Sequence, residues 1–213
     1  MRIKICGITQ VSQGKAIAQL GATMLGFICV HRSPRYISPF QIQAVIKEVP
    51  ITVGSIGVFA NASLLEIEQV LNQTELTGIQ LHGDESPQFC HQIKQRFSHL
   101  ELIKAFRIKT SKSLQAIPAY FNEVDTLLLD AYHPNLLGGT GHTFNWKILE
   151  QFNPPLPWLL AGGLTPDNIE QSLTWLHPTG IDLSSGVEES PGDKNLTKVA
   201  KLFALLQDIN LLK

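Results

Sequence analysis

The feature that most constrains the fold is a regular alternation of short apolar runs with longer segments that carry apolar residues at helical spacing. The short runs are rich in Ile, Val and Leu, and each is followed by one helical segment. This order is typical of repeated βα units, in which parallel strands are covered by helices. Eight strands are predicted, at residues 3–6, 24–30, 51–59, 78–82, 101–106, 126–130, 158–162 and 180–184.

The same pattern predicts eight helices, one after each strand. They span residues 12–20, 39–48, 63–71, 87–97, 114–121, 145–152, 166–176 and 195–212. Three of them begin with a capping residue or with a proline in the first turn, at Ser63, Ser86-Pro87 and Thr165-Pro166. Pro118 interrupts the fifth helical pattern, so we expect a short or broken element there.

Eight βα units in 213 residues favour an α/β fold with a single domain over residues 1–213, a (β/α)8 TIM barrel with a parallel eight-stranded core. The competing architecture is an open, doubly wound sheet. Its dinucleotide fingerprint is missing, because residues 139–144 end in Phe144 where the third glycine belongs. The chain also lacks the Gly-Lys-Ser/Thr of a Walker A loop. The single barrel is therefore preferred.

The charge balance excludes several classes of partner. Seventeen Lys and Arg against eighteen Asp and Glu give a formal charge of −1, so no basic surplus is available for nucleic acid or an anionic membrane. No apolar run approaches the ~18 residues of a membrane span. The three cysteines are odd in number and scattered, and the N-terminal residues show no secretory signal, so we expect a cytoplasmic protein. An enzyme of small-molecule metabolism fits best.

The alternation of side chains along the strands predicts what fills the barrel. Apolar residues of one parity suit the helix-facing side, and the opposite parity carries polar residues in several strands. On this basis Lys4, Lys104, Asp130 and Asp182 are expected to face the interior. Because unpaired buried charges are costly, such a set implies mutual ion pairs or a bound ligand.

The chemistry of such barrels lies at the carboxyl ends of the strands, where Cys6, His82 and Asp130 are last or nearly last. Cys6 could be a thiolate base or nucleophile if Lys4 lowers its pKa, although a lone cysteine is more often a core residue. Asp130 suits a general acid, with helix capping or a structural ion pair as alternatives. The ordinary interpretation of His82 is a hydrogen-bonded interior histidine. No His or Cys spacing indicates a metal site.

Glycine-rich turns follow the last three predicted strands. In barrels, the loops after strands seven and eight often bind phosphate through exposed backbone N–H groups. Each turn taken alone is more often an ordinary tight turn than a binding loop. The turns are Gly138-Gly139-Thr140-Gly141, Gly162-Gly163 and Ser184-Ser185-Gly186.

Arg35 lies in the sequence Ser33-Pro34-Arg35-Tyr36, in the loop after the second predicted strand. A guanidinium group at this end of a barrel could hold a substrate carboxylate through two parallel hydrogen bonds. The alternative is a charge exposed on the surface.

Taken together, these segments resemble one family, phosphoribosylanthranilate isomerase. The resemblance covers most of the chain, and its first and last segments are specific in combination. The segments are Lys4-Ile5-Cys6-Gly7-Ile8-Thr9, Gly26-Phe27, Ser33-Pro34-Arg35-Tyr36, Gly57-Val58-Phe59-Ala60-Asn61, Gln80-Leu81-His82-Gly83-Asp84, Leu128-Leu129-Asp130, Gly138 to Phe144, Ala161-Gly162-Gly163-Leu164 with Asn168, Asp182 to Glu188, and Pro191-Gly192.

The resemblance implies an Amadori rearrangement of N-(5'-phosphoribosyl)anthranilate to 1-(2-carboxyphenylamino)-1-deoxyribulose 5-phosphate, in tryptophan biosynthesis, without cofactor or metal. It makes Asp130 the general acid and Cys6 the general base. It also implies that Arg35 orients the anthranilate part and that backbone near Gly162 and Gly186 holds the phosphate. The substrate-binding residues expected on this basis are Arg35, His82, Gly141, Gly162, Gly163, Asp182, Ser184, Ser185 and Gly186.

Two positions depart from the family pattern: His142 stands where Lys, Arg or Gln is frequent, and Ala161 where Ser is frequent. Neither is in the predicted catalytic pair. The expected partner is a small phosphorylated substrate, and the expected assembly is a monomer or a homodimer. Two other functions stay open: another phosphosugar isomerase with this barrel, and a binding protein for phosphorylated metabolites without catalysis.

Overall fold

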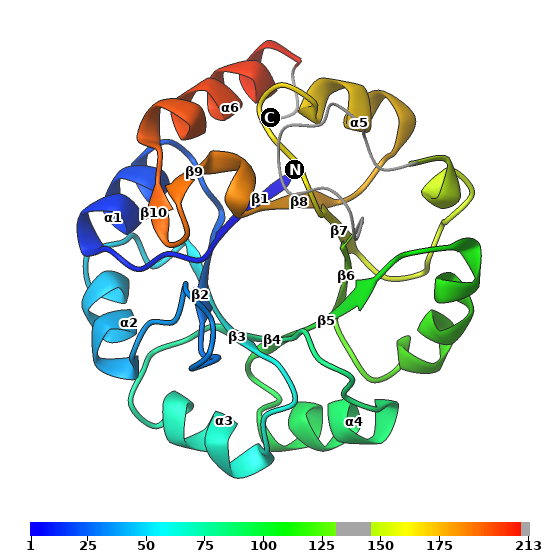
Figure 1. Cartoon of the computed structure of the whole chain (residues 1–213). Helices are drawn as coiled ribbons and strands as arrows, with labels where there is room; N and C mark the ends of the chain where they lie inside the picture. Colours follow the sequence, from blue (N-terminus) through cyan, green and yellow to red (C-terminus); the bar gives the residue numbers. More distant parts are fainter. Residues whose placement is uncertain (131–145, 210–213) are drawn as a thin grey trace.

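The computed structural model describes residues 1–130 and 146–209, and in Figure 1 the strands ring the centre of a barrel with the helices outside. Each strand pairs in parallel with the next, and β8 pairs with β1 to close the sheet. All eight predicted strands are present, although β3 starts later than predicted because residues 51–53 form a turn. The strands are β1 Arg2–Cys6, β2 Met24–Ile28, β3 Gly54–Phe59, β4 Gly78–Leu81, β5 Glu101–Arg107, β6 Thr126–Asp130, β7 Trp158–Ala161 and β8 Gly180–Leu183.

Helical segments follow the strands and cover the outside of the barrel (Figure 1). They are α1 Val11–Gln19, α2 Pro39–Ile46, α3 Leu64–Leu71, α4 Pro87–Arg96, η1 Ser111–Tyr120, η2 Trp146–Leu149, α5 Ile169–Trp175, η3 Ser185–Val187 and α6 Leu196–Asp208. The fifth element, η1, is a 3-10 helix with Pro118 inside it, in line with the broken helix that was predicted. The sixth, η2, is shorter than predicted and also 3-10. No helix in the described residues is long and apolar enough to cross a membrane.

Two of the three predicted helix starts are confirmed. Ser63 accepts a hydrogen bond from the Glu66 N–H in a complete capping box, and Ser86 caps α4, with Pro87 in its first turn. The start at Thr165-Pro166 is wrong, because α5 begins at Ile169. The Thr165 hydroxyl instead accepts from the Asp167 N–H at 3.2 Å, which stabilises a turn that leads into the helix.

A short antiparallel hairpin that the periodicity did not predict follows β8 and η3. Its strands are β9 Glu188–Ser190 and β10 Asp193–Lys194. Gln13 of α1 holds β10 through both ends of its amide: Nε2 donates to the Lys194 carbonyl at 3.1 Å, and Oε1 accepts from the Lys194 N–H at 2.9 Å. Residues far apart in the chain are thereby joined next to the carboxyl end of β1.

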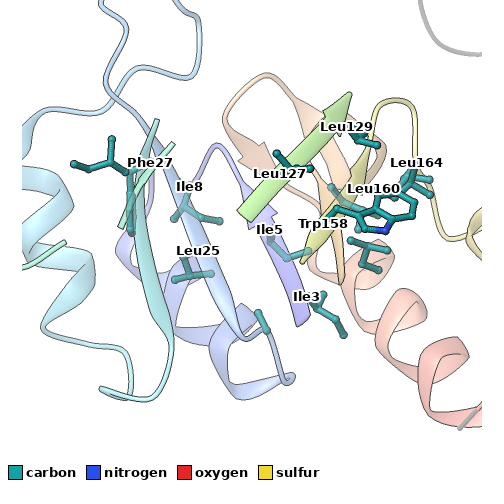
Figure 2. Packing of buried hydrophobic residues seen from close by; sticks show 14 of the residues in the cluster. Ile3, Ile5, Ile8, Leu25, Phe27, Leu127, Leu129, Trp158, Leu160 and Leu164 are labelled. Atoms are coloured by element: carbon teal, nitrogen blue, oxygen red, sulfur yellow. The ribbon is translucent and has the colours of Figure 1, made fainter. Parts of the chain in front are cut away.

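Apolar side chains form two separate buried layers, one on each face of the barrel sheet. The outer layer lies between strands and helices, and Figure 2 shows part of it, including Ile3 and Ile5 of β1 and Leu127 and Leu129 of β6. Each fully buried aliphatic side chain of this kind contributes roughly 1.5–3 kcal/mol. The inner layer inside the barrel consists of Met24, Ile56, Ile103, Ala105, Leu128, Leu159 and Ala161.

The inner layer confirms the predicted parity for three of the four charged residues and corrects it for Lys104. Lys4 is aligned with Met24 and with Asp182, and Asp130 is aligned with Ala161, so these side chains share the interior face. In β5, however, Ile103 and Ala105 belong to the inner layer. Lys104 therefore faces the helices, aligned with Leu81, and is buried there. Parity alone misplaced it because β5 is apolar on both faces.

Candidate active site

Cys6 ends β1 inside the barrel, beside a buried ion pair. Lys4 Nζ lies 2.9 Å from Asp182 Oδ1 and is fully buried. Cys6 is two residues beyond Lys4, hence on the same face, and is 5% exposed. The residue aligned with Cys6 is Gly26, on which a Cβ would lie 2.7 Å from the Cys6 sulfur and 3.0 Å from Lys4 Nζ. A glycine at this position therefore makes room for a sulfur and an ammonium side by side.

The environment of Cys6 opposes ionisation more than the sequence predicts. Burial raises the pKa of the Cys6 thiol, the positive charges of Lys4 and Lys194 lower it, and the net shift is upward. Lys4 thus lowers the pKa, as the thiolate interpretation required, but burial, with the negative charge of Asp182, outweighs it, because a neutral thiol is favoured where water is excluded. For Lys4 itself, burial lowers the pKa, but Asp182 and Cys6 outweigh it, so the pKa is raised and the ammonium is retained.

Asp130 ends β6 at the same end of the barrel and is held by a short hydrogen-bonded chain. His82 Nε2 lies 3.3 Å from Asp130 Oδ2, and His82 Nδ1 lies 2.9 Å from Gln80 Nε2. When the Gln80 amide donates to Nδ1, the ring proton sits on Nε2 and is donated to Asp130. Gln80 is buried, so it fixes His82 and through it the Asp130 carboxyl group.

A hollow of about 450 Å³ opens beside Asp130. It is lined by His82, Arg107, Lys109 and Asp130. Arg107 is aligned with Asp130 across β5 and β6. The apolar run predicted a strand end at Phe106, so Arg107 was not among the predicted site residues. It lies on the same face as Ile103 and Ala105, four and two residues on from them, and this alternation was the signal that could have found it. Two cations here suit an anionic ligand next to the carboxyl group.

Arg35 is not the exposed surface charge that was one alternative. Its Nε lies 2.9 Å from Glu188 Oε1 and its Nη2 2.6 Å from Glu188 Oε2, so the guanidinium already holds one carboxylate bidentately. Glu188 Oε1 also accepts from Lys194 Nζ at 2.7 Å. Burial raises the pKa of Glu188, but Arg35 and Lys194 lower it by more. Glu188 and Lys194, which were not predicted as site residues, thus belong to the site.

The loops after β7 and β8 are packed together, as a shared phosphate site requires. Gly162 and Gly163 have φ values of 92° and 66°, which glycine adopts without strain. A Cβ on Gly186 would overlap the Leu164 carbonyl oxygen, so only glycine permits this contact between the loops. Asn168 orders the first loop by donating to the Gly163 carbonyl at 2.9 Å.

The structure therefore gathers most of the predicted site residues at one end of the barrel. Ser184 Oγ lies 3.2 Å from the position of a Cβ on Gly7, next to Cys6, and Ser185 begins η3. Gly141 and the rest of the 138–144 turn, with His142, lie outside the described residues. Among the residues that are described, no group of three or more His, Cys, Asp or Glu could hold a metal ion.

Comparison with known proteins identifies one family. Residues 3–204 match the model of the N-(5'phosphoribosyl)anthranilate (PRA) isomerase family. The N-(5'-phosphoribosyl)anthranilate isomerase of Rippkaea orientalis is 73% identical over 210 residues, which cover 99% of this chain and 98% of that protein. The corresponding enzyme of Crocosphaera subtropica is 65% identical, over 99% of this chain and 100% of that protein.

Solved structures agree with this assignment. The phosphoribosyl anthranilate isomerase of Thermotoga maritima superposes with a TM-score of 0.89 at 31% identity, over 98% of this chain and 99% of that one. A second solved isomerase, in complex with reduced 1-(o-carboxyphenylamino)-1-deoxyribulose 5-phosphate, gives a TM-score of 0.86 at 29% identity, with the same coverage. Both the sequence and the whole barrel are thus similar to this family.

Proposed function

Because the chain belongs to the N-(5'-phosphoribosyl)anthranilate isomerase family, we propose that Asp130 and Cys6 are the acid and the base of its reaction. That reaction is an aldose–ketose isomerisation in tryptophan biosynthesis, the Amadori rearrangement of N-(5'-phosphoribosyl)anthranilate to 1-(2-carboxyphenylamino)-1-deoxyribulose 5-phosphate. The protein supplies proton transfer and positioning from its own side chains, at the end of the barrel where Cys6 and Asp130 lie.

In the first step, Asp130 donates a proton to the furanose ring oxygen. The bond between C1' and this oxygen breaks while the nitrogen lone pair forms a C=N bond to C1', which opens the sugar to a Schiff base. The Cys6 thiolate then removes the proton from C2'; the electron pair of that C–H bond forms the C1'–C2' double bond of an enolamine, and the second pair of the C=N bond returns to the nitrogen as its lone pair. Transfer of a proton to C1' and loss of the hydroxyl proton give the C2' ketone. General acid–base steps of this kind typically contribute about 10²–10⁴-fold each.

The observation that supports these roles most strongly is the shared orientation of Cys6 and Asp130. Each is the last residue of its strand, β1 and β6, and each lies on the interior face defined by its aligned neighbours. The two strands are separated around the barrel only by β7 and β8. One substrate in the barrel mouth could therefore meet both groups from different sides.

Arg35 is proposed to receive the anthranilate carboxylate. The guanidinium binds Glu188 in the geometry that the substrate carboxylate would require. When substrate binds, its carboxylate must therefore share Arg35 with Glu188 or replace Glu188. Gly162, Gly163, Ser185 and Gly186 are proposed to hold the phosphate, because their two loops meet at Gly186. Remote phosphate binding supplies positioning energy at the sugar. We assign the remaining substrate contacts to His82, Gly141, Asp182 and Ser184.

The wider setting follows from the same assignment. We propose a cytoplasmic enzyme, since Cys6, Cys29 and Cys90 are all free thiols. We propose a monomer or a homodimer with one barrel domain per chain over residues 1–213. A solved structure of the Thermotoga maritima isomerase contains monomers generated from a dimeric enzyme. Sedimentation of this protein distinguishes the two states.

Fluorescence of the anthranilate group tests the proposal, with the unstable substrate generated in the cuvette. Cys6→Ser and Asp130→Asn are each expected to lower turnover by about 10²–10⁴-fold at equal folded concentration. Cys90→Ala is the matched control, since Cys90 lies in the outer layer away from the site.

Four results would overturn parts of this assignment. Full activity in Cys6→Ser would remove the thiolate from the mechanism, and full activity in Asp130→Asn would remove the acid. Absence of turnover in the wild type would instead support a barrel that only binds a phosphorylated metabolite. Comparable turnover of the related aminoaldose of histidine biosynthesis would show that the enzyme is not specific for the anthranilate substrate.

A further inference from the structure

Lys194 is a buried cation that was not predicted from the sequence as a site residue and has no role in the proposed mechanism. It lies in β10, and its side chain is 0% exposed. The hairpin that carries it is tied to the rest of the barrel mouth: Gln13 binds the Lys194 backbone, and the Thr9 hydroxyl donates to the Gly192 carbonyl. The ammonium group is therefore held in a defined place.

That place is beside the turn that follows Cys6. Lys194 Nζ lies 3.4 Å from the position that a Cβ would occupy on Gly7, the residue that follows Cys6. Gly7 has a φ of 80°, so the chain turns sharply after Cys6 and leaves the space that the ammonium occupies. The other contacts of Lys194 Nζ are Glu188 Oε1 at 2.7 Å and the Ser184 carbonyl at 3.4 Å.

The charges around Cys6 do not balance while the thiol is neutral. Within residues 1–130 and 146–209, the cations that interact with Cys6 are Lys4, Arg35 and Lys194, and the carboxylates paired with them are Asp182 and Glu188. Cys29 is a neutral neighbour, since burial raises its pKa to about 12. Three cations thus share two carboxylates. One further negative charge would neutralise the set, and a Cys6 thiolate is that charge.

Of these three cations, Lys194 is the least fully paired with the two carboxylates. Lys4 pairs with Asp182, and Arg35 covers both oxygens of Glu188. Lys194 donates to a single oxygen, Glu188 Oε1, which also accepts from Arg35. In agreement with this, burial lowers the pKa of Lys194, and Glu188 and Cys6 restore only part of the shift.

We propose that Lys194 is a positioning residue for the reaction, whose buried ammonium group is the counter-charge that allows Cys6 to exist as a thiolate. This inference rests on the proposed role of Cys6 as the base. It assigns the β9–β10 hairpin an electrostatic function: the hairpin delivers one uncompensated positive charge to the carboxyl end of β1. Loss of that charge is expected to raise the pKa of Cys6 and so to remove the ionised base.

Thiolate absorbance in the ultraviolet, followed during a pH titration, tests the proposal without using turnover. Each protein is titrated beside the same protein carrying Cys6→Ser, and the difference reports Cys6 alone. Burial raises the pKa of Cys90 to about 11 and that of Cys29 to about 12, but both thiols are present in the two proteins compared, so their absorbance cancels in the difference. Lys194→Met is expected to move the Cys6 midpoint up by about one to three pH units.

Three further variants separate electrostatics from structure. Lys194→Arg keeps the charge and is expected to restore most of the wild-type midpoint. Lys198→Met removes a neighbouring cation that donates only to the Glu188 backbone carbonyl, and it is expected to leave the midpoint unchanged. Glu188→Gln removes a competing carboxylate and is expected to lower the midpoint; it also serves if Lys194→Met does not fold.

The proposal is overturned if folded Lys194→Met, or Glu188→Gln in its place, titrates Cys6 at the wild-type midpoint. It is also overturned if the wild type shows no absorbance that depends on Cys6. Failure of the proposed mechanism would look different: Cys6→Ser would retain turnover, whatever the titration of Cys6 shows.

Discussion

Two buried ion pairs of the same length lie on opposite faces of the barrel sheet. Lys4 and Asp182 are 2.9 Å apart inside the barrel, and Lys104 and Glu85 are 2.9 Å apart between the sheet and the helices. The donors of Lys104 are fully used, because Nζ also donates to the carbonyls of Gly83 at 2.8 Å and Ala105 at 3.1 Å. Lys4 instead interacts with two side chains, its partner Asp182 and the thiol of Cys6.

The difference teaches that the face of the sheet, and not the residue types, determines what a buried pair does. Glu85 accepts from the N–H groups of Asn61 and Gly83, so the outer pair fixes the loop that carries His82. In the inner pair, Lys4 interacts with Cys6 as well as with Asp182. Two strand lysines with similar burial thus stabilise a loop in one case and, in the proposed mechanism, adjoin the base in the other.

The largest effect is expected when the inner pair is broken. Lys4→Met leaves Asp182 buried without its partner, which should cost about 3 kcal/mol or more in the free energy of unfolding. It also removes a cation from Cys6, so turnover of the folded protein should fall at least about tenfold. Urea unfolding and fluorescence turnover measure the two effects. Unchanged turnover would show that Lys4 is structural, like Lys104.

Breaking the outer pair is expected to affect stability alone. Lys104→Met should cost about 3–5 kcal/mol, because Glu85 stays buried without its ion-pair partner. Turnover of the folded fraction should stay near the wild-type value, since Lys104 lies on the far side of the sheet from Cys6. The double variant with Glu85→Gln should lose less than the sum of the single variants. A turnover loss equal to that of Lys4→Met would contradict the expectation that only the inner pair affects turnover.

Acid is expected to weaken the outer pair. Burial raises the pKa of Glu85, but the Asn61 N–H and Lys104 lower it by more, so the folded-state value lies below the unfolded one. A depressed carboxyl pKa stabilises the fold fully above the unfolded value of about 4.3, and this stabilisation is lost as pH falls below it. The free energy of unfolding in urea should therefore fall less steeply with decreasing pH in Glu85→Gln than in the wild type. Equal slopes for the variant and the wild type would contradict this.

The smallest effect sets the baseline for both pairs. Lys15 and Glu48 are also 2.9 Å apart, but about half of each side chain is exposed. Water screens such a pair, so Lys15→Met should change the unfolding free energy by less than about 1 kcal/mol. Calorimetric melting is sufficient to measure it. A loss as large as that of Lys104→Met would mean that distance, and not burial, determines the cost.

Much of the fold could be predicted from local signals. The alternation of apolar runs and helical segments gives the eight strands, and Ser63 and Ser86 mark two helix starts, because both signals depend on neighbours within a few residues. The hairpin after β8 escaped prediction because β9 and β10 are only three and two residues long and carry no periodicity. The start of α5 was misplaced because Thr165 caps a turn instead of the helix.

The candidate site could be predicted only where position in a strand was enough. Cys6 and Asp130 follow from the rule that barrel chemistry lies at the carboxyl ends of strands. Arg107 was not predicted because β5 has buried apolar residues on both faces, so its alternation does not show which face is the interior one. The pairing of Arg35 with Glu188 joins residues 153 positions apart, and no spacing in the chain indicates it.

By itself, the sequence determined the order of strands and helices, the closed parallel barrel that this order favours, and the strand-end positions of the predicted acid and base. The tertiary structure alone decided which buried lysine faces the barrel interior, which carboxylate Arg35 holds, and that Lys194 lies beside the turn that follows Cys6. The physical reason is the range of the forces involved. Periodicity and capping act between near neighbours in the chain, whereas the charge balance of a buried site depends on groups that only the closed barrel brings together.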